Sequence, residues 1–450
     1  MPQDAHGHTL TTQSEEAARA FDATITGYLK YRFDTPLRLK ALLKADPEFG
    51  LAHVLKGCFA MLAYKQAHVA AAKDALAGAE RLTAKATERE RAHVAALAAW
   101  TEDEMDRALA IWEQIMAEHP RDILAFRLHH FCAFWLGRPE QMLKAVETVL
   151  PHWDATVPHW GSALACCSFA NEECGHYTVA EAAGRAAIEL DPGDLWAVHA
   201  VAHVLEMQGR RGEGIAWIQD LKQHFDGANN LLHHIWWHQA MYHLERREWD
   251  IVLALYDEGF RNLASPVTQQ QPDLYIDVQN AASMLFRLAR HGVDVGNRWE
   301  ELADKAEARI GDCHSAFTLP HWMMALTAAG RFAAAERMLA GMRDYAGANR
   351  GTTAPIVARY ALPVSEAVLR HGRGDHAGAV AVMRPALQGM HALGGSHAQQ
   401  DVLEQLFLDA AMKAGLVEDT RMLLERVAGR HPVPPERRLG YAEAARAVEH

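Results

Sequence analysis

Cysteine is scarce in this sequence of 450 residues, which contains only six. None of the six forms a C-x-x-C pair or a spaced zinc framework, so neither a disulfide scaffold nor a cysteine-based zinc site is expected. Cys166, Cys167 and Cys174 are expected to be small buried side chains. Reduced thiols are typical of a cytoplasmic protein, and the sequence predicts that location.

A surplus of basic charge is also missing. Lysine and arginine number 45 against 57 aspartate and glutamate residues, for a net charge of −12. Such a chain has no global basic surface for a polyphosphate backbone, so a nucleic-acid partner is not expected. The longest uncharged stretches, such as residues 313–330, contain histidine and proline, and residues 1–21 lack the basic and apolar parts of a signal peptide. A soluble protein with no membrane partner is therefore expected.

The alternation of Val, Ile and Thr that is typical of strands is rare. Apolar residues instead recur at spacings of three and four along most of the chain, which predicts an all-α protein. The clearest helical segments in the first part of the chain are 15–29, 36–43, 49–64, 69–82, 88–100 and 105–118.

Regular turn markers follow from about residue 105 onward. They are Gly137, Gly175, Gly209, Arg246-Arg247, Gly292, Gly330, Gly374 and Gly415, and neighbouring markers, counted from Arg246 in the arginine pair, lie 34 to 46 residues apart. This spacing predicts helical-hairpin repeats. The segment 194–217 resembles a tetratricopeptide repeat, with an aromatic residue opening the first helix and a glycine turning the hairpin. Stacked hairpins of this kind predict a right-handed superhelical solenoid with a concave groove lined by first helices.

The predicted organisation has three parts. Residues 1–100 form an N-terminal helical cap with a polar N-terminal segment, and residues 101–429 form the tetratricopeptide-like repeats. Residues 430–450 form a short charged tail. Because the first helices line the groove, candidate functional residues are sought on them.

Histidine is abundant, with 27 residues in the chain. In the helix 196–206, His199, His203 and Glu206 follow the spacing i, i+4, i+7 and form a polar stripe apart from the apolar one. His234 and His238 share a face of the next first helix. The sequence therefore predicts imidazoles from two neighbouring hairpins on one surface.

Further titratable residues fall in the first helices of other hairpins. They are Glu172, Asp277, Arg287, His321, His397 and Asp401. A superhelix brings successive first helices side by side, so these residues are expected to converge with the histidines on one groove. Alone, each of these histidines fits an ordinary structural hydrogen bond equally well. The prediction of a ligand-binding site therefore depends on the convergence of all these residues, not on any one of them.

Several functions fit this groove. The leading hypothesis is binding of a small polar molecule or a peptide segment among His, Asp and Glu side chains. A metal-assisted or metal-free hydrolase or lyase is the alternative, with His203 or His238 as base, Glu206 or Asp277 orienting the ring, and Arg287 holding an anionic group. A divalent ion, Zn or Fe, would use His199, His203, His234 and His238. A protein-assembly scaffold and self-association as a homo-oligomer stay open.

Several longer segments resemble the tetratricopeptide repeat protein 38 family. They are 196–210, 236–245, 253–257, 277–287 and 394–401. The resemblance implies a tetratricopeptide-like superhelix and places several of the candidate residues in family motifs, but it implies no activity and no role for them. Arg247 departs from the pattern, in which the family tends to have a turn glycine.

Overall fold

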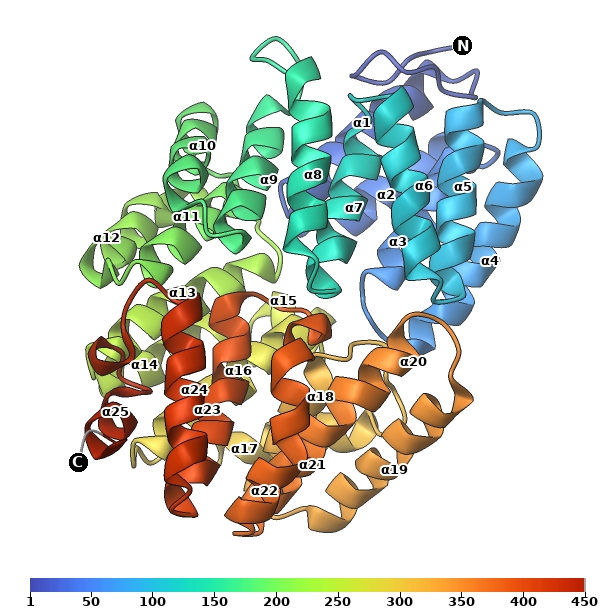
Figure 1. Ribbon diagram of the computed structural model, residues 1–450. Helices are drawn as coiled ribbons and strands as arrows, with labels where there is room; N and C mark the ends of the chain where they lie inside the picture. The colour runs from blue at the N-terminus through green and yellow to red at the C-terminus, as the bar shows by residue number, and fades with distance from the viewer. Residues whose placement is uncertain (449–450) are drawn as a thin grey trace. The chain divides into compact units, whose positions relative to one another are not determined.

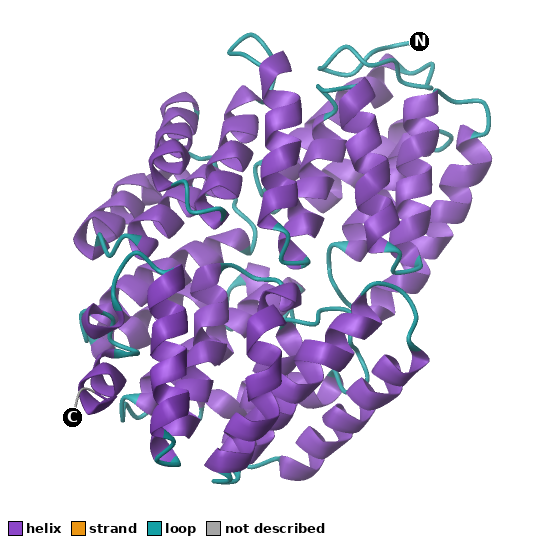
Figure 2. Ribbon diagram, in the orientation of Figure 1, coloured by secondary structure: helices purple, strands orange, loops and turns teal. Residues whose placement is uncertain are grey.

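The computed structural model describes residues 1–448 and, within them, consists of helices joined by short turns, without a strand (Figure 2). The only β pairing among these residues is two isolated bridges, Gln3 with Thr9 and Arg32 with Ala228. The all-α prediction is confirmed. None of the described helices is both long and apolar enough to cross a membrane.

The chain divides into two compact units. Unit 1 comprises Met1–Val201 and Leu221–Leu232, and unit 2 comprises Ala202–Asp220 and His233–His450. The change from one to the other falls inside helix α11 (Leu195–Met207). The sequence predicted boundaries after residues 100 and 429, which separate a helical cap, the repeats and a tail. The division into compact units does not test these boundaries, and they stay a prediction.

Unit 1 is built from consecutive helices that pack mainly against their neighbours in the chain. They are α1 (Glu15–Leu29), α2 (Thr35–Ala45), α3 (Gly50–Met61), α4 (Gln66–Thr83), α5 (Glu88–Thr101), α6 (Met105–Glu118), α7 (Ile123–Trp135), α8 (Pro139–Val149), α9 (Trp160–Glu173) and α10 (Tyr177–Leu190). The pairs α3–α4 and α9–α10 share the most extensive contacts, as expected for helical hairpins. Helices α5, α6, α7 and α8 lie side by side in Figure 1.

Unit 2 continues with helices of the same kind. They are α12 (Arg211–Leu221), α13 (Leu231–Glu245), α14 (Trp249–Ala254), α15 (Pro266–Gln270), α16 (Tyr275–Arg290), α17 (Arg298–Ala308), α18 (Thr318–Ala328), α19 (Phe332–Ala348), α20 (Thr353–Ile356), α21 (Leu362–Gly372), α22 (His376–Met383), α23 (His397–Lys413), α24 (Val417–Arg430) and α25 (Ala442–Val448). Two segments, Leu255–Phe260 and Val357–Ala361, are π-helical. Pro363 is the second residue after the second segment, and the wider turn accommodates a residue that lacks an N–H.

The predicted turn markers all adopt the left-handed backbone that reverses a helical hairpin. Gly209 has φ +68° and Arg247 has φ +60°. The other six, Gly137, Gly175, Gly292, Gly330, Gly374 and Gly415, also have positive φ. The helical-hairpin repeat is therefore confirmed in both units, including at the one position where arginine replaces glycine.

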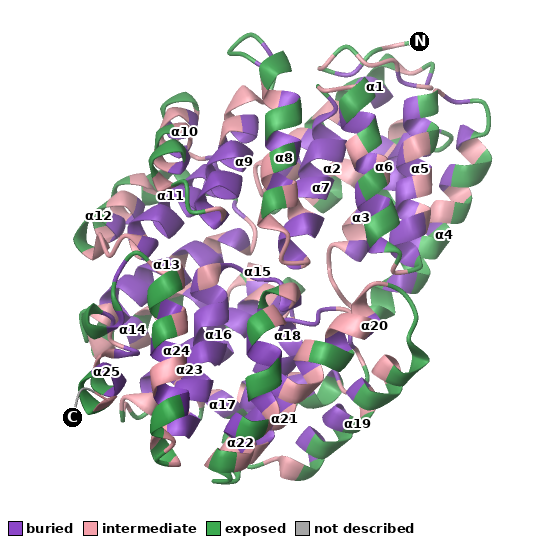
Figure 3. Ribbon diagram, viewed as in Figure 1, coloured by how far each residue is buried: buried purple, intermediate pink, exposed green. Residues whose placement is uncertain are grey.

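Burial separates the two helices of a hairpin. Helix α23 is buried on nearly all sides, whereas its partner α24 has an exposed face (Figure 3). The same contrast holds for α18 and α19. A first helix therefore contacts protein all round, and polar side chains on it are placed in the interior rather than at an open surface.

Both ends of the chain are packed over their described parts. Near the N-terminus, Asp4 accepts hydrogen bonds from the backbone N–H groups of His6 and His8. The segment set apart in the sequence as a charged tail contains helix α25, and Tyr441 within it is 1% exposed. The last two residues, 449–450, lie outside the described part. Charge in this segment thus does not prevent it from contributing to the interior of unit 2.

Candidate functional site

Helices α11 and α13 carry the histidines that the sequence singled out. Helix α11 begins at an aspartate cap, in which the Asp194 carboxylate accepts from the backbone N–H groups of Trp196 (3.1 Å) and Ala197 (3.0 Å). The Oδ1 atom of Asn229 accepts in the same way at the start of α13. Capped starts and left-handed ends fix the register of both helices, and with it the faces on which the histidines lie.

Close packing between α11, α12 and α13 involves Tyr242. Its hydroxyl donates to the carbonyl of Ala202 at 2.6 Å. Gly214 of α12 makes room for the ring, since a Cβ atom there would lie 2.3 Å from the ring carbon Cζ of Tyr242. The glycine and the tyrosine together hold the second half of α11 close to α13.

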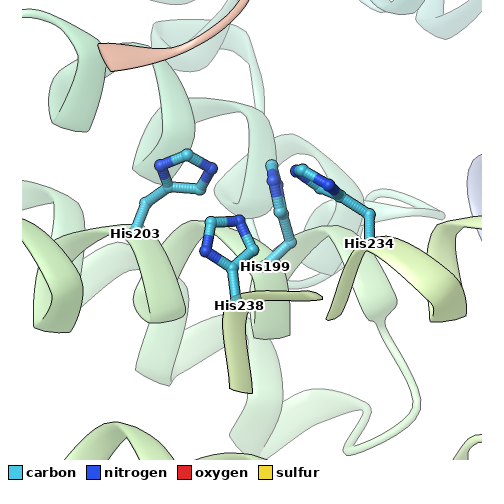
Figure 4. A group of neighbouring side chains, drawn as sticks. All are labelled: His199, His203, His234 and His238. Atoms are coloured by element: carbon cyan, nitrogen blue, oxygen red, sulfur yellow. The ribbon is translucent and has the colours of Figure 1, made fainter. Parts of the chain in front are cut away.

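Three imidazoles of unit 2 meet where α11 and α13 pack. The ring centroids of His203 and His238 are 4.3 Å apart, and those of His234 and His238 are 4.7 Å apart. One ring nitrogen from each of the three lies within 4.8 Å of the others. Figure 4 draws these rings together with His199, which precedes His203 by one turn on the same continuous helix. We call His203, His234 and His238 the histidine cluster.

Hydrogen bonds at Nδ1 orient two rings of the histidine cluster. The Nδ1 atom of His234 lies 2.8 Å from Oδ1 of Asn280, and that of His238 lies 2.7 Å from Oε2 of Glu206. In both rings Nδ1 is the nitrogen that bonds the outer partner, and Nε2 is the other ring nitrogen. An outer partner of this kind fixes the ring and its tautomer, as is usual for metal-binding histidines.

The cluster is electrically neutral. Burial lowers the pKa of His203 and of His234 well below the ordinary value, and it lowers the pKa of His238 to about 3. Burial also raises the pKa of Glu206 to about 8, against the opposing charge of Arg287. Near neutral pH the folded protein therefore holds an undissociated carboxyl group against a neutral imidazole.

Glu206 also lines a recess in unit 2. Its space is ≈ 500 Å³, open solvent included. The residues around it are Glu206, Met207, Arg211, Met241, Tyr242, Glu245, His397, Ala398, Asp401, His431, Val433 and Arg438. Among the candidates from the sequence, Glu206, His397 and Asp401 thus share one recess. Because Glu206 also contacts His238, the recess and the histidine cluster are neighbours.

The charged groups of the recess are paired with one another. Arg211 contacts Glu245 at 2.6 Å, and Arg438 contacts Asp401 at 2.5 Å. Asp401 also accepts from the hydroxyl of Tyr441 at 2.5 Å. Burial alone would raise its pKa, but the charge of Arg438 and other surrounding partners hold the pKa of Asp401 well below its usual range. The carboxylate is therefore ionised and compensated within the protein.

The remaining candidates take other places. Asp277 lies 3.0 Å from Nδ1 of His233, so it orients a different ring from those of the histidine cluster. Arg287 donates to the Ala398 carbonyl at 3.1 Å and lies 3.5 Å from Asp401. His321 contacts the Phe317 carbonyl through Nδ1 at 2.8 Å. Glu172 is buried in α9 of unit 1.

The expectation of an open groove needs a correction. His203 and His238 are each 0% exposed, and Asp277, Arg287 and His321 are each 1% exposed. These side chains are interior groups because helices pack on both sides of the first helices. The recess is open to solvent, and His397 in its lining is only partly buried.

Sequence analysis missed several residues around the recess. Glu245, Arg438 and Tyr441 were not candidates, although Glu245 contacts the backbone N–H of Leu439 at 3.2 Å across 194 positions of the chain. The apolar Leu-Gly-Tyr at 439–441, within an otherwise charged segment, was the available signal that this segment is packed. Its partners could not be read from local spacing.

The comparisons with known proteins add little beyond the fold. No family model matches the sequence. Yeast Tom70 aligns with 10% identity over 96% of this chain and 86% of its own, with a TM-score of 0.38. A monomeric mutant of IFIT1 with Gppp-AAAA aligns with 13% identity over 98% and 95%, with a TM-score of 0.36. The Naa15/Naa10 complex bound to HypK-THB gives 12% identity over 92% and 68%, with a TM-score of 0.26. TM-scores at this level carry no argument about function.

Proposed function

We propose that unit 2 binds a small, uncharged polar molecule in the recess beside Glu206. The observation that carries this proposal is the internal pairing of charges. Arg211 with Glu245 and Arg438 with Asp401 form two ion pairs within the recess wall. A ligand with a full charge would lose its hydration without gaining an opposite charge, which is costly.

The other polar groups of the recess suit hydrogen bonding to a neutral molecule. Burial lowers the pKa of His397 and of His431 to about 4, so both rings are neutral near pH 7. A neutral imidazole offers one donor and one acceptor. Nδ1 of His397 is buried without a hydrogen-bond partner among residues 1–448. This nitrogen is a group that a bound ligand would satisfy.

A panel of small molecules tests the charge preference directly. Neutral amides and polyols, each with a carboxylate and an amine of similar size, are added to the chelator-treated full chain, and the melting temperature is measured. Stabilisation is expected for neutral members only, because only ligands that bind the folded state raise it. Equal or greater stabilisation by the charged members would overturn the proposal.

A matched pair of variants locates the binding. His397→Phe places a larger apolar ring in the recess and is expected to abolish the response to the neutral ligands. His391→Phe makes the same change at an exposed position and is expected to keep it. A response that survives His397→Phe would place the binding elsewhere.

An enzymatic role is the second candidate, and one contact favours it. Glu206 lies in the recess wall and bonds Nδ1 of His238 at 2.7 Å, so a carboxyl–imidazole pair stands next to any bound molecule. If the protein chemically converts a ligand of the panel, the variant Glu206→Gln is expected to bind that ligand still and to lose the turnover. Unchanged turnover in that variant would remove the pair from the reaction.

We further propose that the chain is a member of the tetratricopeptide repeat protein 38 family and acts in the cytoplasm. The motifs at 196–210, 236–245 and 394–401 support the family, and they cover α11, most of α13 and the start of α23. All six cysteines are free thiols in the structure, which supports a reducing compartment. Localisation of the tagged full chain tests the second statement.

A further inference from the structure

The histidine cluster has a composition that packing alone does not explain. Buried polar side chains ordinarily pair with a different kind of group, as a donor with an acceptor. Here three imidazoles contact each other by their ring faces and edges, with centroid separations of 4.3 and 4.7 Å for the two closest pairs. Three neutral imidazoles from two helices are a ligand set that transition metals prefer.

The outer hydrogen bonds point the same way. Asn280 and Glu206 occupy the Nδ1 atoms of His234 and His238 at 2.8 and 2.7 Å. An amide oxygen can only accept, so Nδ1 of His234 carries the proton and its Nε2 has a lone pair. Metal-binding histidines characteristically use one nitrogen for such a partner and the other for the ion.

The spacing is close to that of a coordination sphere. One nitrogen from each ring of the histidine cluster lies within 4.8 Å of the others. Nitrogens bound to one tetrahedral zinc are roughly 3.3 Å apart, since each Zn–N bond is about 2.0–2.1 Å. Side-chain movements of about 1.5 Å or less, the difference between these two distances, would close the set.

We propose that His203, His234 and His238 bind one divalent transition-metal ion through ring nitrogens. Zinc is the ion that best suits three neutral nitrogens with a fourth, open position in a tetrahedral arrangement. Asn280 and Glu206 are positioning residues, because each acts on the ion only through a histidine. This site is separate from ligand binding in the recess, which is tested on chelator-treated protein.

Metal titration of the full chain tests the proposal. The purified protein is stripped with a chelator and titrated with Zn(II) in the presence of a chromophoric competitor, and with Co(II) followed by visible absorption. One equivalent per chain is expected, with the intense bands of tetrahedral Co(II) and a rise in melting temperature. Absence of stoichiometric binding of both ions would overturn the proposal.

Variants separate this site from adventitious binding by the other histidines. His234→Gln and His238→Gln are each expected to lower zinc affinity by more than about 100-fold, since outer-partner losses alone cost about 10–100-fold. Asn280→Ala is expected to lower zinc affinity by about 10–100-fold and to keep the stoichiometry of one ion per chain. His321→Gln is the matched control, a buried histidine of unit 2 outside the cluster, and it is expected to bind as the wild type does.

The outcomes that would contradict the site are specific. Wild-type affinity in His234→Gln, or an equal loss in His321→Gln, would overturn it. Should His238→Gln fail to fold, His234→Gln and Asn280→Ala carry the test.

Discussion

Units 1 and 2 both bury histidines, but they surround them differently. In unit 1, His93 and Arg89 both donate to the carboxylate of Asp122, at 2.9 and 2.8 Å. In unit 2, the rings of the histidine cluster contact each other, and their outer partners are Asn280 and an undissociated Glu206. The first arrangement holds an ionised carboxylate among donors and is structural. The second places neutral rings next to one another with neutral outer partners, and it is the arrangement on which the proposed metal site rests.

The largest expected difference concerns the two buried carboxyl groups. Burial alone would raise the pKa of Asp122, but the charges of His93 and Arg89 hold it well below its usual value. Asp122→Asn is therefore expected to lower the free energy of unfolding by about 3 kcal/mol, because the buried Arg89 loses its closer carboxylate and keeps only the longer contact to Asp4 at 3.6 Å. In chelated protein Glu206→Gln is expected to cost less than about 1 kcal/mol, because an amide replaces an uncharged carboxyl and can still form a hydrogen bond with Nδ1 of His238.

Urea denaturation followed by circular dichroism at mildly acidic pH measures both losses. The two variants are matched, since each replaces a buried carboxyl by the corresponding amide. Equal losses would mean that Glu206 is ionised in the folded protein, and the contrast between the two units would disappear.

The pH dependence of stability gives a smaller and sharper difference. The carboxyl of Glu206 has a pKa of about 8 in the folded protein and about 4.5 when unfolded. Between these values the carboxyl of Glu206 holds its proton in the folded state and loses it in the unfolded state, so the contribution of Glu206 to stability falls as pH rises. From pH 6.5 to 8 this contribution is expected to fall by about 1–2 kcal/mol. Histidines whose pKa is lowered by burial change stability in the opposite direction over this range, so the effect of Glu206 is measured as the difference between the wild type and a variant that lacks this carboxyl.

The variant Glu206→Gln is the control for this change. In chelated form it keeps the contribution of the histidines and lacks that of Glu206, so its stability relative to the wild type is expected to rise by about 1–2 kcal/mol from pH 6.5 to 8. Asp122→Asn is expected to keep the wild-type slope there, since the pKa of Asp122 is already lowered in the folded protein. A stability difference between the wild type and Glu206→Gln that stays constant over this range would contradict the protonated Glu206.

The smallest expected effect compares a turn from each unit. Arg247 of unit 2 is exposed with φ +60°, whereas Gly175 of unit 1 has φ +79°. Arg247→Gly is expected to stabilise the protein by about 0.5–1 kcal/mol, because the left-handed backbone conformation costs free energy for a residue that has a Cβ atom. Gly175→Ala is expected to destabilise it by about 1 kcal/mol for the same reason. No atom would lie within 4 Å of the added Cβ at Gly175, so backbone conformation alone accounts for the loss.

Thermal unfolding of these two variants measures the difference. An unchanged melting temperature in both would mean that the turns tolerate either residue and that the departure at Arg247 has no energetic meaning.

Local structure could be predicted from the sequence because its causes are local. The segments 15–29 and 105–118 were predicted with the bounds that α1 and α6 have. The i, i+4 spacing of His234 and His238 likewise placed their rings in contact, with a centroid distance of 4.7 Å. Helical periodicity and turn residues determine such features within one or two turns of the chain.

The surroundings of the site depended on contacts between distant positions. Arg438 reaches Asp401 across 37 positions, and no periodicity relates the two. The polar stripe on α11 indicated a surface, but helices on both sides of a first helix place it in the interior. Spacing therefore identified which side chains share a face and could not identify what covers that face.

The chain passes between the two units three times, after Val201, after Asp220 and after Leu232. Neither unit is therefore encoded by one uninterrupted stretch of the gene, and any fragment that contains all of one unit also carries part of the other. On the ribosome, unit 1 is completed only when residue 232 has emerged, by which time Ala202–Asp220 of the other unit is already outside. Fragments that end near the middle of the chain are thus expected to be poor substitutes for the full protein.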